Sequence, residues 1–460
     1  MRQTGAYCHR MPGKKLGPTA DVGIWTAEVL RDPTPPRRRI YSPGERDLLQ
    51  SALSRWQGLG YVEPSHALVQ CNPLFVPKKS GDIRTCIDYQ PINEVIADFE
   101  WPLPRIQDVR HWVCDHTWFS RLDLLDAYHS LTVPEPFRPL TAFQTPWGGF
   151  QFTVMPFGLK TAVSVFQRKM DVTLIRHKDH GLWYIDDTLV RGKTRTECRQ
   201  RTGRIVRALQ QGGFQINWKK SVVAVQRLGF CGLQIGPEGI TVGTEIARLR
   251  DWGLPVTKKD KQSLLGFANY FRENIPGFAG LAAPLYPDGE GRIRASDLRE
   301  ATERLVEGCM KHVMTHHFNY DQSSQLFTDA SKYAVSGVLS QGKKIVGIFS
   351  KGLTPAQSRY STTDREHLAL VLAVEKFRIF VQSNKTLAVR TDHQALLDRR
   401  SADLTPRQER WRYRVVSIAP IIEYVRGMEN PADYWSRKGN AWTKGGHEEH
   451  INGSSPLSSS

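Results

Sequence analysis

The chain has 460 residues, 40% of them hydrophobic, which is enough for two to four domains with ordinary globular cores. Its net charge of +17 indicates a polyanionic partner such as nucleic acid, although a basic surface can also serve solubility alone. The seven cysteines are scattered without metal-binding spacing, which indicates reduced thiols and argues against structural zinc. No apolar stretch reaches the length of a membrane span.

The first predicted elements follow a segment without apolar periodicity. Residues 1–40 contain prolines followed by three arginines, which predicts an extended arm or linker. Apolar residues then recur at helical spacing from Ser42 to about Gly60. Strand-like runs at residues 74–76 and 83–89 flank Lys78-Lys79-Ser80-Gly81-Asp82, which predicts a hairpin with a basic tip.

Further strand and helix signals continue to about Ile235, and a helical pattern runs from Gln262 to Phe271. A charged segment at about 288–316 leads into a second mixed domain at about 318–437. Residues 438–460 are rich in Gly, Ser and His, which predicts a disordered tail.

Two adjacent acids, Asp186 and Asp187, interrupt an apolar run from Leu182 to Val190 and predict the tip of a β-hairpin. Neighbouring carboxylates repel, so a divalent metal is the simplest reason for the pair, and a plain polar turn is the alternative. Upstream, Asp123 ends an apolar strand and Asp126 follows three residues later. Alone, an acid such as Asp123 would more often be a helix cap than a metal ligand.

Four more acids occupy comparable places in the second domain. Asp329 and Asp392 each follow a strand-like run, Glu366 begins an apolar helix, and Asp433 lies in a first helical turn. Each has a structural alternative: Glu366 and Thr363 match a capping box, the two post-strand acids could cap helices, and Asp433 could favour a helix dipole.

Together with these acids, eight motifs occur in a fixed order: Lys78–Asn93, Phe119–His129, Thr141–Thr145, Gly149–Lys160, Phe166–Arg168, Tyr184–Asp187, Leu228–Phe230 and Ser263–Arg272. This order resembles the reverse transcriptase and RNase H segment of gypsy-type LTR retrotransposons over about residues 41–437. The resemblance implies an α+β and α/β multidomain protein with a right-hand polymerase of fingers, palm and thumb, a connection region and an RNase H-like domain. The implied parts are an arm (1–40), fingers and palm (41–236), thumb and connection (237–317), the RNase H-like domain (318–437) and a tail (438–460).

In the polymerase half, the resemblance implies that Asp123 and Asp186 hold two magnesium ions, which manganese can replace. Asp187 would lie beside them with weaker direct contact, and the backbone carbonyl of Leu124 would add a ligand. Magnesium prefers such hard oxygen ligands, and the paired ions suit attack by a primer 3′-hydroxyl.

Other residues would bind the incoming nucleotide. Tyr128 would exclude a ribose 2′-hydroxyl, with an ordinary half-buried aromatic as the alternative, while Lys78 or Lys79 with Arg84 would grip the triphosphate unless the lysines are merely solvated. The implied nucleotide-binding residues are Lys78, Lys79, Arg84, Asp126, Ala127, Tyr128, Phe157 and Gly158.

In the second domain, Asp329, Glu366, Asp392 and Asp433 would hold two further magnesium ions and cleave the RNA strand of RNA–DNA hybrids. The implied partners are RNA and DNA template–primers, RNA–DNA hybrids and dNTPs, with no membrane, in an intracellular, cytoplasmic virus-like particle with nuclear access. The residues leave open whether the working form is a monomer or a dimer.

Four positions depart from the family pattern, namely Gln90, Thr161, Val163 and Trp435, whereas all seven acids are present. The rival hypotheses are a host-retained, non-catalytic nucleic-acid-binding derivative, which predicts decayed acids, and an unrelated metal-dependent nuclease, which does not explain residues 78–187. Missing protease, zinc-knuckle and integrase motifs predict one segment of a larger polyprotein or the remnant of a degraded element.

Overall fold

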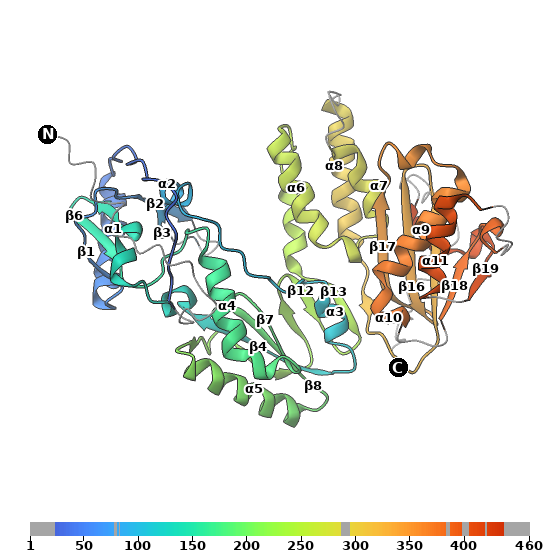
Figure 1. Cartoon of the computed structure of the whole chain (residues 1–460), viewed down its shortest axis with the longest axis horizontal. Helices are drawn as coiled ribbons and strands as arrows, with labels where there is room; N and C mark the ends of the chain where they lie inside the picture. Colours follow the sequence, from blue (N-terminus) through green and yellow to red (C-terminus); the bar gives the residue numbers. More distant parts are fainter. Residues whose placement is uncertain are drawn as a thin grey trace, which may run out of the picture. The chain divides into compact units, whose positions relative to one another are not determined.

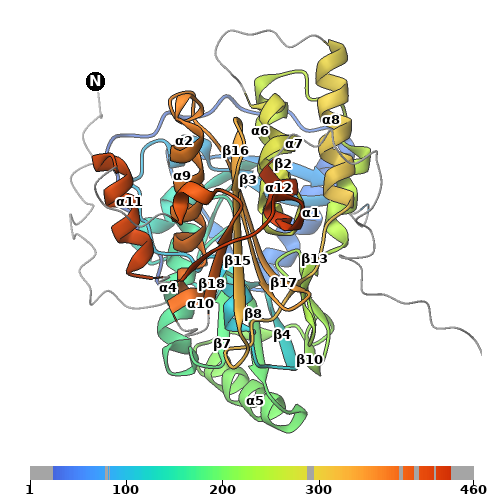
Figure 2. The same cartoon turned by 90° about the vertical axis from the view of Figure 1, so that its right-hand side faces the viewer.

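The computed structural model of this protein describes residues 24–77, 81, 83–286, 295–382, 387–397, 404–418 and 421–436. Two compact units divide the chain (Figures 1 and 2). Unit 1 comprises residues up to Ile106 and Trp118–Val225, and unit 2 comprises Gln107–Thr117 and the residues from Gln226 onward. The predicted tail at 438–460, and all of the predicted basic hairpin tip except Gly81, lie outside the described residues.

The predicted first helix of unit 1 is α1 (Pro43–Gly58). It begins at Ser42, whose side chain accepts a hydrogen bond from the Glu45 amide in a capping box, and it buries Leu49 and Leu53. The predicted hairpin strands form a two-stranded sheet of β2 (Asn72–Pro77) and β3 (Ile83–Asp88), and the short helix α2 (Gln90–Asn93) follows.

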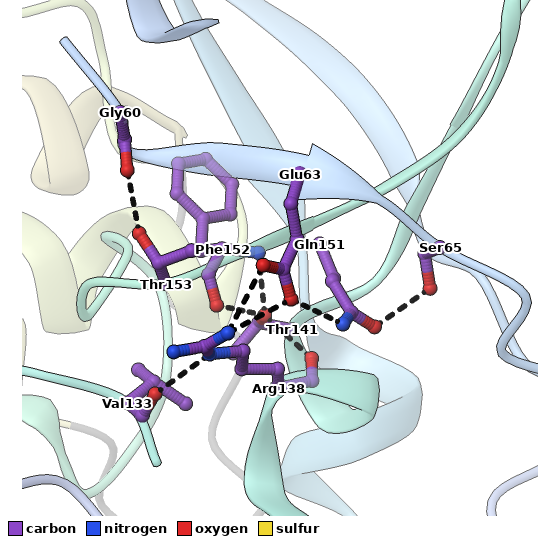
Figure 3. A network of polar contacts seen from close by, with 9 residues as sticks. All are labelled: Gly60, Glu63, Ser65, Val133, Arg138, Thr141, Gln151, Phe152 and Thr153. Atoms are coloured by element: carbon purple, nitrogen blue, oxygen red, sulfur yellow. Dashed lines mark hydrogen bonds and ion pairs between the residues drawn. The ribbon is translucent and has the colours of Figure 1, made fainter. Parts of the chain in front are cut away.

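A three-stranded sheet lies beside α1 and has the order β1 (Val62–Pro64), β6 (Gly148–Phe152), β5 (Phe143–Thr145). A polar network braces one side of it (Figure 3). Arg138 Nη1 donates to both carboxylate oxygens of Glu63, at 3.0 Å to Oε2 and 3.1 Å to Oε1, and Oε1 also accepts a hydrogen bond from Gln151 Nε2 at 2.8 Å. The Thr141 hydroxyl accepts a hydrogen bond from the Phe152 amide, so both contacts fix the C-terminal end of β6, which carries the buried Phe152.

The central sheet of unit 1 carries the predicted acids. Its strands, in spatial order, are β10 (Val222–Val225), β4 (Trp118–Leu125), β8 (Asp187–Gly192) and β7 (Gly181–Tyr184), with β9 (Gln215–Ile216) paired to the end of β4. Helices α4 (Ala162–Leu174) and α5 (Arg195–Gln211) pack on this sheet and bury Phe166, Met170 and Ile205 in the core.

The described part of the N-terminal segment, residues 24–40, is extended but anchored in unit 1. Trp25 is fully buried, and its indole N–H donates a hydrogen bond of 2.9 Å to Thr161 Oγ1. Thr161, which departs from the family pattern, therefore accepts a hydrogen bond that closes the core beneath this segment.

Unit 2 begins with helices around a four-stranded sheet. The strands follow the order β11 (Leu228–Phe230), β12 (Leu233–Ile235), β13 (Gly239–Val242), β14 (Thr315–His316), and the helices are α6 (Lys258–Tyr270), α7 (Phe278–Ala282) and α8 (Ala295–Met310). Helix α8 forms in the segment that the sequence predicts only as charged. Its buried residues, Leu298, Ala301 and Leu305, are separated by many acidic and basic residues, which obscure the helical spacing in the sequence.

Helix α3 (Asp108–Trp112) packs in unit 2, although unit 1 precedes and follows it in the chain. The guanidinium of Arg110 lies 2.9 Å from the carboxylate of Glu273 and also donates hydrogen bonds to Asn274 and Thr315. Glu273 in addition pairs with Lys376. This buried node ties α3 to two other parts of unit 2.

The last sheet of unit 2 has five strands in the order β17 (Lys344–Gly352), β16 (Ala334–Gln341), β15 (Ser324–Ala330), β18 (Leu387–Thr391), β19 (Ile422–Tyr424). Its helices are α9 (Thr362–Lys376), α10 (Arg378–Gln382), α11 (Pro406–Val416) and α12 (Pro431–Ser436). Neighbouring β15 residues point to opposite faces: Leu326 packs in the core under α9, and Phe327 packs with Ala432 of α12 (Figure 2).

The cap of α9 differs from the one that the sequence predicts. Ser361, not Thr363, caps α9 by accepting a hydrogen bond from the Asp364 amide, so Glu366 is not part of a capping box. Among the described helices, none combines the length and the apolar character that crossing a membrane requires.

Candidate active sites

The unit 1 carboxylates, Asp123, Asp186 and Asp187, lie where β4 faces the hairpin of β7 and β8, but their ligand atoms do not form a group within 4.8 Å of one another. Asp123 and Asp187 are directly opposite partners in the antiparallel register of β4 and β8, so both side chains leave the same face of the sheet. Asp186 lies in the turn between β7 and β8. Like charges opposite one another destabilise a sheet, which is a reason to expect a cation at this position.

The pKa values of the unit 1 carboxylates reflect this crowding. Burial raises the pKa of Asp187 to about 6, and the neighbouring charge of Asp186 adds to the effect. Burial also raises the pKa of Asp186, with a further contribution from Asp123, while Lys220 acts in the opposite direction. The cluster therefore favours a bound positive charge.

The turn that presents Asp186 is strained. Ile185 has φ of 56°, in the left-handed region that a β-branched residue rarely adopts. Its amide donates a hydrogen bond of 2.9 Å to the side-chain oxygen of Gln167, which is fully buried in α4. Gln167 in turn donates to Asp171 Oδ1 at 2.9 Å, and the Trp183 indole donates to the same oxygen at 2.5 Å. Gln167 and Asp171 thus hold the hairpin tip in place.

Tyr128 lies beside the unit 1 carboxylates. Its ring centroid is 5.0 Å from that of Phe157 and 5.1 Å from that of Phe166. Burial raises the pKa of Tyr128 to about 12, and the charge of Asp186 contributes. The Tyr128 phenol is therefore neutral at pH 7, and it packs against two aromatic rings next to Asp186.

Gly158 lies beyond Phe157 with φ of +101°. A Cβ there would approach the Ile87 carbonyl oxygen to 3.3 Å. Glycine at this position therefore permits both the backbone conformation and the close approach of β3.

A pocket of about 420 Å³ opens in unit 1 beside Phe157. Ten of its fifteen described lining residues belong to the predicted motifs, among them Arg84, Asp126, His129 and Phe157. The Arg84 guanidinium lies over the Phe157 ring at 5.8 Å from its centroid. Two of the implied nucleotide-binding residues, Lys78 and Lys79, lie outside the described residues.

The sequence interpretation did not identify two residues of this pocket, Arg55 and His129. Arg55 of α1 pairs with Asp126 at 3.4 Å, a contact between residues 71 positions apart that no local pattern reveals. His129 directly follows Tyr128, and this proximity was the available signal. Its Nδ1 is buried without a hydrogen-bond partner among the described residues, and burial lowers its pKa.

The remaining two implied residues of unit 1 lie on either side of Asp126. Leu124 is buried on β4 opposite Ile216 of β9, and Ala127 is buried at the start of the 3₁₀ turn Ala127–Ser130. Asp126 itself adopts the left-handed region with φ of 45°. The chain therefore turns sharply between the carboxylate Asp123 and the aromatic residue Tyr128.

The unit 2 carboxylates, Asp329, Glu366 and Asp392, form a tighter group. Of the potential metal ligands in the described part of the chain, only these three bring their ligand atoms within 4.8 Å of one another. β15 and β18 are parallel neighbours in which Thr328 lies opposite Thr391, so the acids that follow these two residues lie at the same edge of the sheet. α9 packs across β15 and supplies Glu366.

Glu366 is the most perturbed acid of the protein's described residues. Only 5% of it is exposed, and burial together with the charges of Asp329 and Asp392 raises its pKa to about 9. Its Oε1 accepts a hydrogen bond from the Ala330 amide, whereas its buried Oε2 has no partner in the described part of the protein. An orphaned carboxylate oxygen within a group of hard oxygen donors fits a divalent metal.

Asp433 lies near the sheet but outside this close group. It is in the first turn of α12, as predicted, and its amide donates to the Asn430 carbonyl. The Asn430 side chain donates to Thr328 O at 3.0 Å, and Ser336 Oγ donates to Ala432 O at 2.7 Å. These contacts fix the start of α12 against β15 and β16.

Comparison with known proteins gives matches along most of the chain. A family model for the reverse transcriptase (RNA-dependent DNA polymerase) matches residues 76–266, and one for the RNase H-like domain found in reverse transcriptase matches residues 319–416. The transposon Tf2-3 and Tf2-7 polyproteins of Schizosaccharomyces pombe are 30% and 29% identical to it over 423 residues. These alignments cover 88% of this chain but 31% of each polyprotein, so the chain spans about a third of their length.

Two solved structures of foamy viral protease-reverse transcriptase show the same fold. The complex with double-stranded DNA has a TM-score of 0.72 at 18% identity, covering 88% of this chain and 73% of that one. The complex with an RNA/DNA hybrid has a TM-score of 0.67 at 18% identity, covering 89% and 57%. The family models and the transposon polyproteins confirm the resemblance drawn from the motifs, and the solved structures confirm the predicted fold class.

Proposed function

We propose that this chain, which belongs to the reverse transcriptases that carry an RNase H-like domain, extends primers on RNA and DNA templates and cleaves the RNA strand of RNA–DNA hybrids. The observation that supports the polymerase activity best is the pairing of Asp123 with Asp187 next to Asp186 in a strained turn. Hybrid cleavage rests on the unit 2 carboxylates, whose ligand atoms lie within 4.8 Å.

In unit 1, Asp123 and Asp186 would hold two magnesium ions, with Asp187 and the Leu124 carbonyl as further oxygen donors. In unit 2, the carboxylates together with Asp433 would hold another two, and manganese is an alternative at both sites. Bound magnesium would acidify the attacking hydroxyl or water and neutralise charge on the phosphate at both sites. The protein's own groups must then place the nucleic acid and the nucleotide.

Tyr128 is suited to select deoxynucleotides. Its ring packs against those of Phe157 and Phe166, so a ribose 2′-hydroxyl above it would collide with a ring held by two aromatic neighbours. Gly158 lets the backbone approach the nucleotide closely. Arg84, spread over Phe157, would donate charge-assisted hydrogen bonds to the triphosphate, as would Lys78 or Lys79.

The net charge and the structural neighbours support RNA and DNA template–primers and RNA–DNA hybrids as partners. The net charge of +17 suits phosphate backbones, and the two structural neighbours hold double-stranded DNA and an RNA/DNA hybrid. In unit 2, selectivity for a hybrid would come from contacts to 2′-hydroxyls and from groove shape rather than from base edges.

A paired assay tests both activities. We expect primer extension on an RNA template with magnesium, and a loss of more than about 100-fold in Asp186→Asn with hybrid cleavage retained. Glu366→Gln should show the reverse pattern. The rival, a non-catalytic nucleic-acid-binding derivative, predicts that wild type binds the hybrid yet extends and cleaves no better than the variants, and that result would refute the proposal.

A further inference from the structure

Two guanidinium groups face the unit 1 pocket from different elements. Arg55 comes from α1 and Arg84 from β3, and Asp126 is the acidic residue among the described residues that line the pocket. His129 also lines it, but burial lowers the pKa of its imidazole and favours the neutral form. The described lining therefore carries one excess positive charge, which suits an anionic ligand.

The ion pair between Arg55 and Asp126 is weak enough for an anionic ligand to replace Asp126 as the partner of Arg55. Their closest atoms are 3.4 Å apart, and 67% of the Arg55 side chain and 33% of the Asp126 side chain are exposed. An exposed pair of this length contributes little to stability. A phosphate offers a guanidinium two oxygens in bidentate geometry and two negative charges in place of one, so it would compete well for Arg55.

The position of this pair indicates which phosphate it faces. Asp123 lies opposite Asp187 in the register of β4 and β8, whereas Asp126 follows the end of β4 and lines the pocket with Arg55. The described residues that line the pocket do not include Asp123, Asp186 or Asp187, so the pair lies to one side of these carboxylates. Because the α-phosphate must reach the unit 1 carboxylates, a cation beside Asp126 faces the outer end of the triphosphate.

We propose that Arg55 binds the terminal phosphate of the incoming nucleoside triphosphate and releases Asp126 when it does so. This inference rests on the proposed polymerase function, because it takes the pocket as the nucleotide site. It adds a contact from α1 to those expected from β3, so the two elements would hold the triphosphate from different sides. Such a contact would distinguish a triphosphate from a diphosphate.

Equilibrium binding to a chain-terminated template–primer tests this without any chemistry. Arg55→Gln should weaken dTTP binding about tenfold, the scale of one charge-assisted hydrogen bond, and change dTDP binding by less than about twofold. Inorganic tripolyphosphate should compete with dTTP about tenfold less well in this variant. Arg46→Gln removes an equal charge from an exposed position of the same helix and should change neither affinity.

Two steady-state measurements complete the test. In primer extension, Arg55→Gln should raise the KM for dTTP about tenfold with kcat within twofold, and Arg55→Lys should recover part of the loss. Equal weakening of dTTP and dTDP, unchanged dTTP binding, or no dTTP binding by wild type would each overturn the inference. Arg55-dependent dTTP binding without any primer extension would instead refute the polymerase function and leave the contact standing.

Discussion

The acids of unit 1 and unit 2 are brought together in different ways. In unit 1, a strand register places Asp187 opposite Asp123 and a hairpin turn presents Asp186 next to them, and the cost is a backbone strain at Ile185. In unit 2, two strands and a helix bring three acids into a buried group, and the cost is electrostatic, with the Glu366 pKa raised to about 9. One chain thus uses two physical means of holding like charges close together. The unit 1 site should be sensitive to geometry, and the unit 2 site to charge.

Loss of the turn's support should have the largest effect. Gln167→Leu removes the acceptor for the Ile185 amide, so the hairpin tip can relax and Asp186 can shift. We expect primer extension to fall about 100-fold, the scale of a misplacement near 1 Å, while hybrid cleavage is unchanged. Gln210→Ala, at an exposed position of α5, is the matched control. Extension within twofold of wild type would contradict a geometric role for Gln167.

Charge removal in unit 2 should increase stability while abolishing cleavage. Without metal, Glu366→Gln removes a buried, repelled acid and should raise the free energy of unfolding of unit 2 by about 1–3 kcal/mol at pH 7. Magnesium should then stabilise wild type and not the variant. Hydrogen exchange of the β15 amides measures both effects.

Glu366→Gln also tests how the free energy of unfolding depends on pH. The pKa of Glu366 is raised from 4.5 to about 9 by folding, so native protein binds more protons than unfolded protein between these values. Stability of the metal-free protein should therefore fall as pH rises from about 4.5 to about 9. Glu366→Gln should lack this contribution, and an identical pH slope in both proteins would contradict the assignment.

Unit 1 also holds a buried cationic side chain, Lys169 of α4. Burial lowers the pKa of Lys169 to about 8, although its ammonium donates to Ser130 O at 2.7 Å and lies 4.5 Å from the Phe214 ring centroid. Lys169→Met should stabilise unit 1 by about 1–2 kcal/mol at pH 7. Because the unfolded protein binds more protons than the native protein between about pH 8 and 10.5, wild-type stability falls as the pH is lowered through this range. The stability advantage of Lys169→Met should therefore shrink as the pH is raised from about 8 to 10.5. Denaturant unfolding at pH 7 and pH 10 compares the two proteins.

Relief of the strained turn should have the smallest effect. Ile185→Gly adopts positive φ freely and should raise stability by up to about 1 kcal/mol, with extension slowed severalfold as the tip becomes less rigid. Thermal unfolding and kcat report the two changes. A loss of stability above about 1 kcal/mol would show that the side chain of Ile185 stabilises more than its backbone costs.

The acids of both sites could be predicted because each lies within a local pattern. Asp186 and Asp187 interrupt a strand-forming run, and Asp329 and Asp392 directly follow apolar strands, so the chain itself fixes where these side chains emerge. The first helix was also predictable, since its apolar spacing and its Ser42 cap are local.

Features that depend on distant contacts could not be predicted. Trp25 lies in a segment without periodicity, yet its indole bonds Thr161, which is 136 residues away. Lys169 occupies the buried face of α4, where patterning favours an apolar residue. Its ammonium finds partners there in the Ser130 carbonyl and the Phe214 ring, which are distant in the sequence. Arg55 could not be assigned to the pocket, because its partner Asp126 is 71 residues away.

The placement of α3 has a consequence for how the chain is made. Arg110 finds its partner Thr315 only 205 residues later, and Glu273 is also far downstream. At about 5–20 residues per second, a ribosome would take roughly 10–40 s to supply that partner. During this time α3 lacks its contacts in unit 2, so residues 107–117 wait for their final packing while the unit 1 residues on both sides of them are already synthesised.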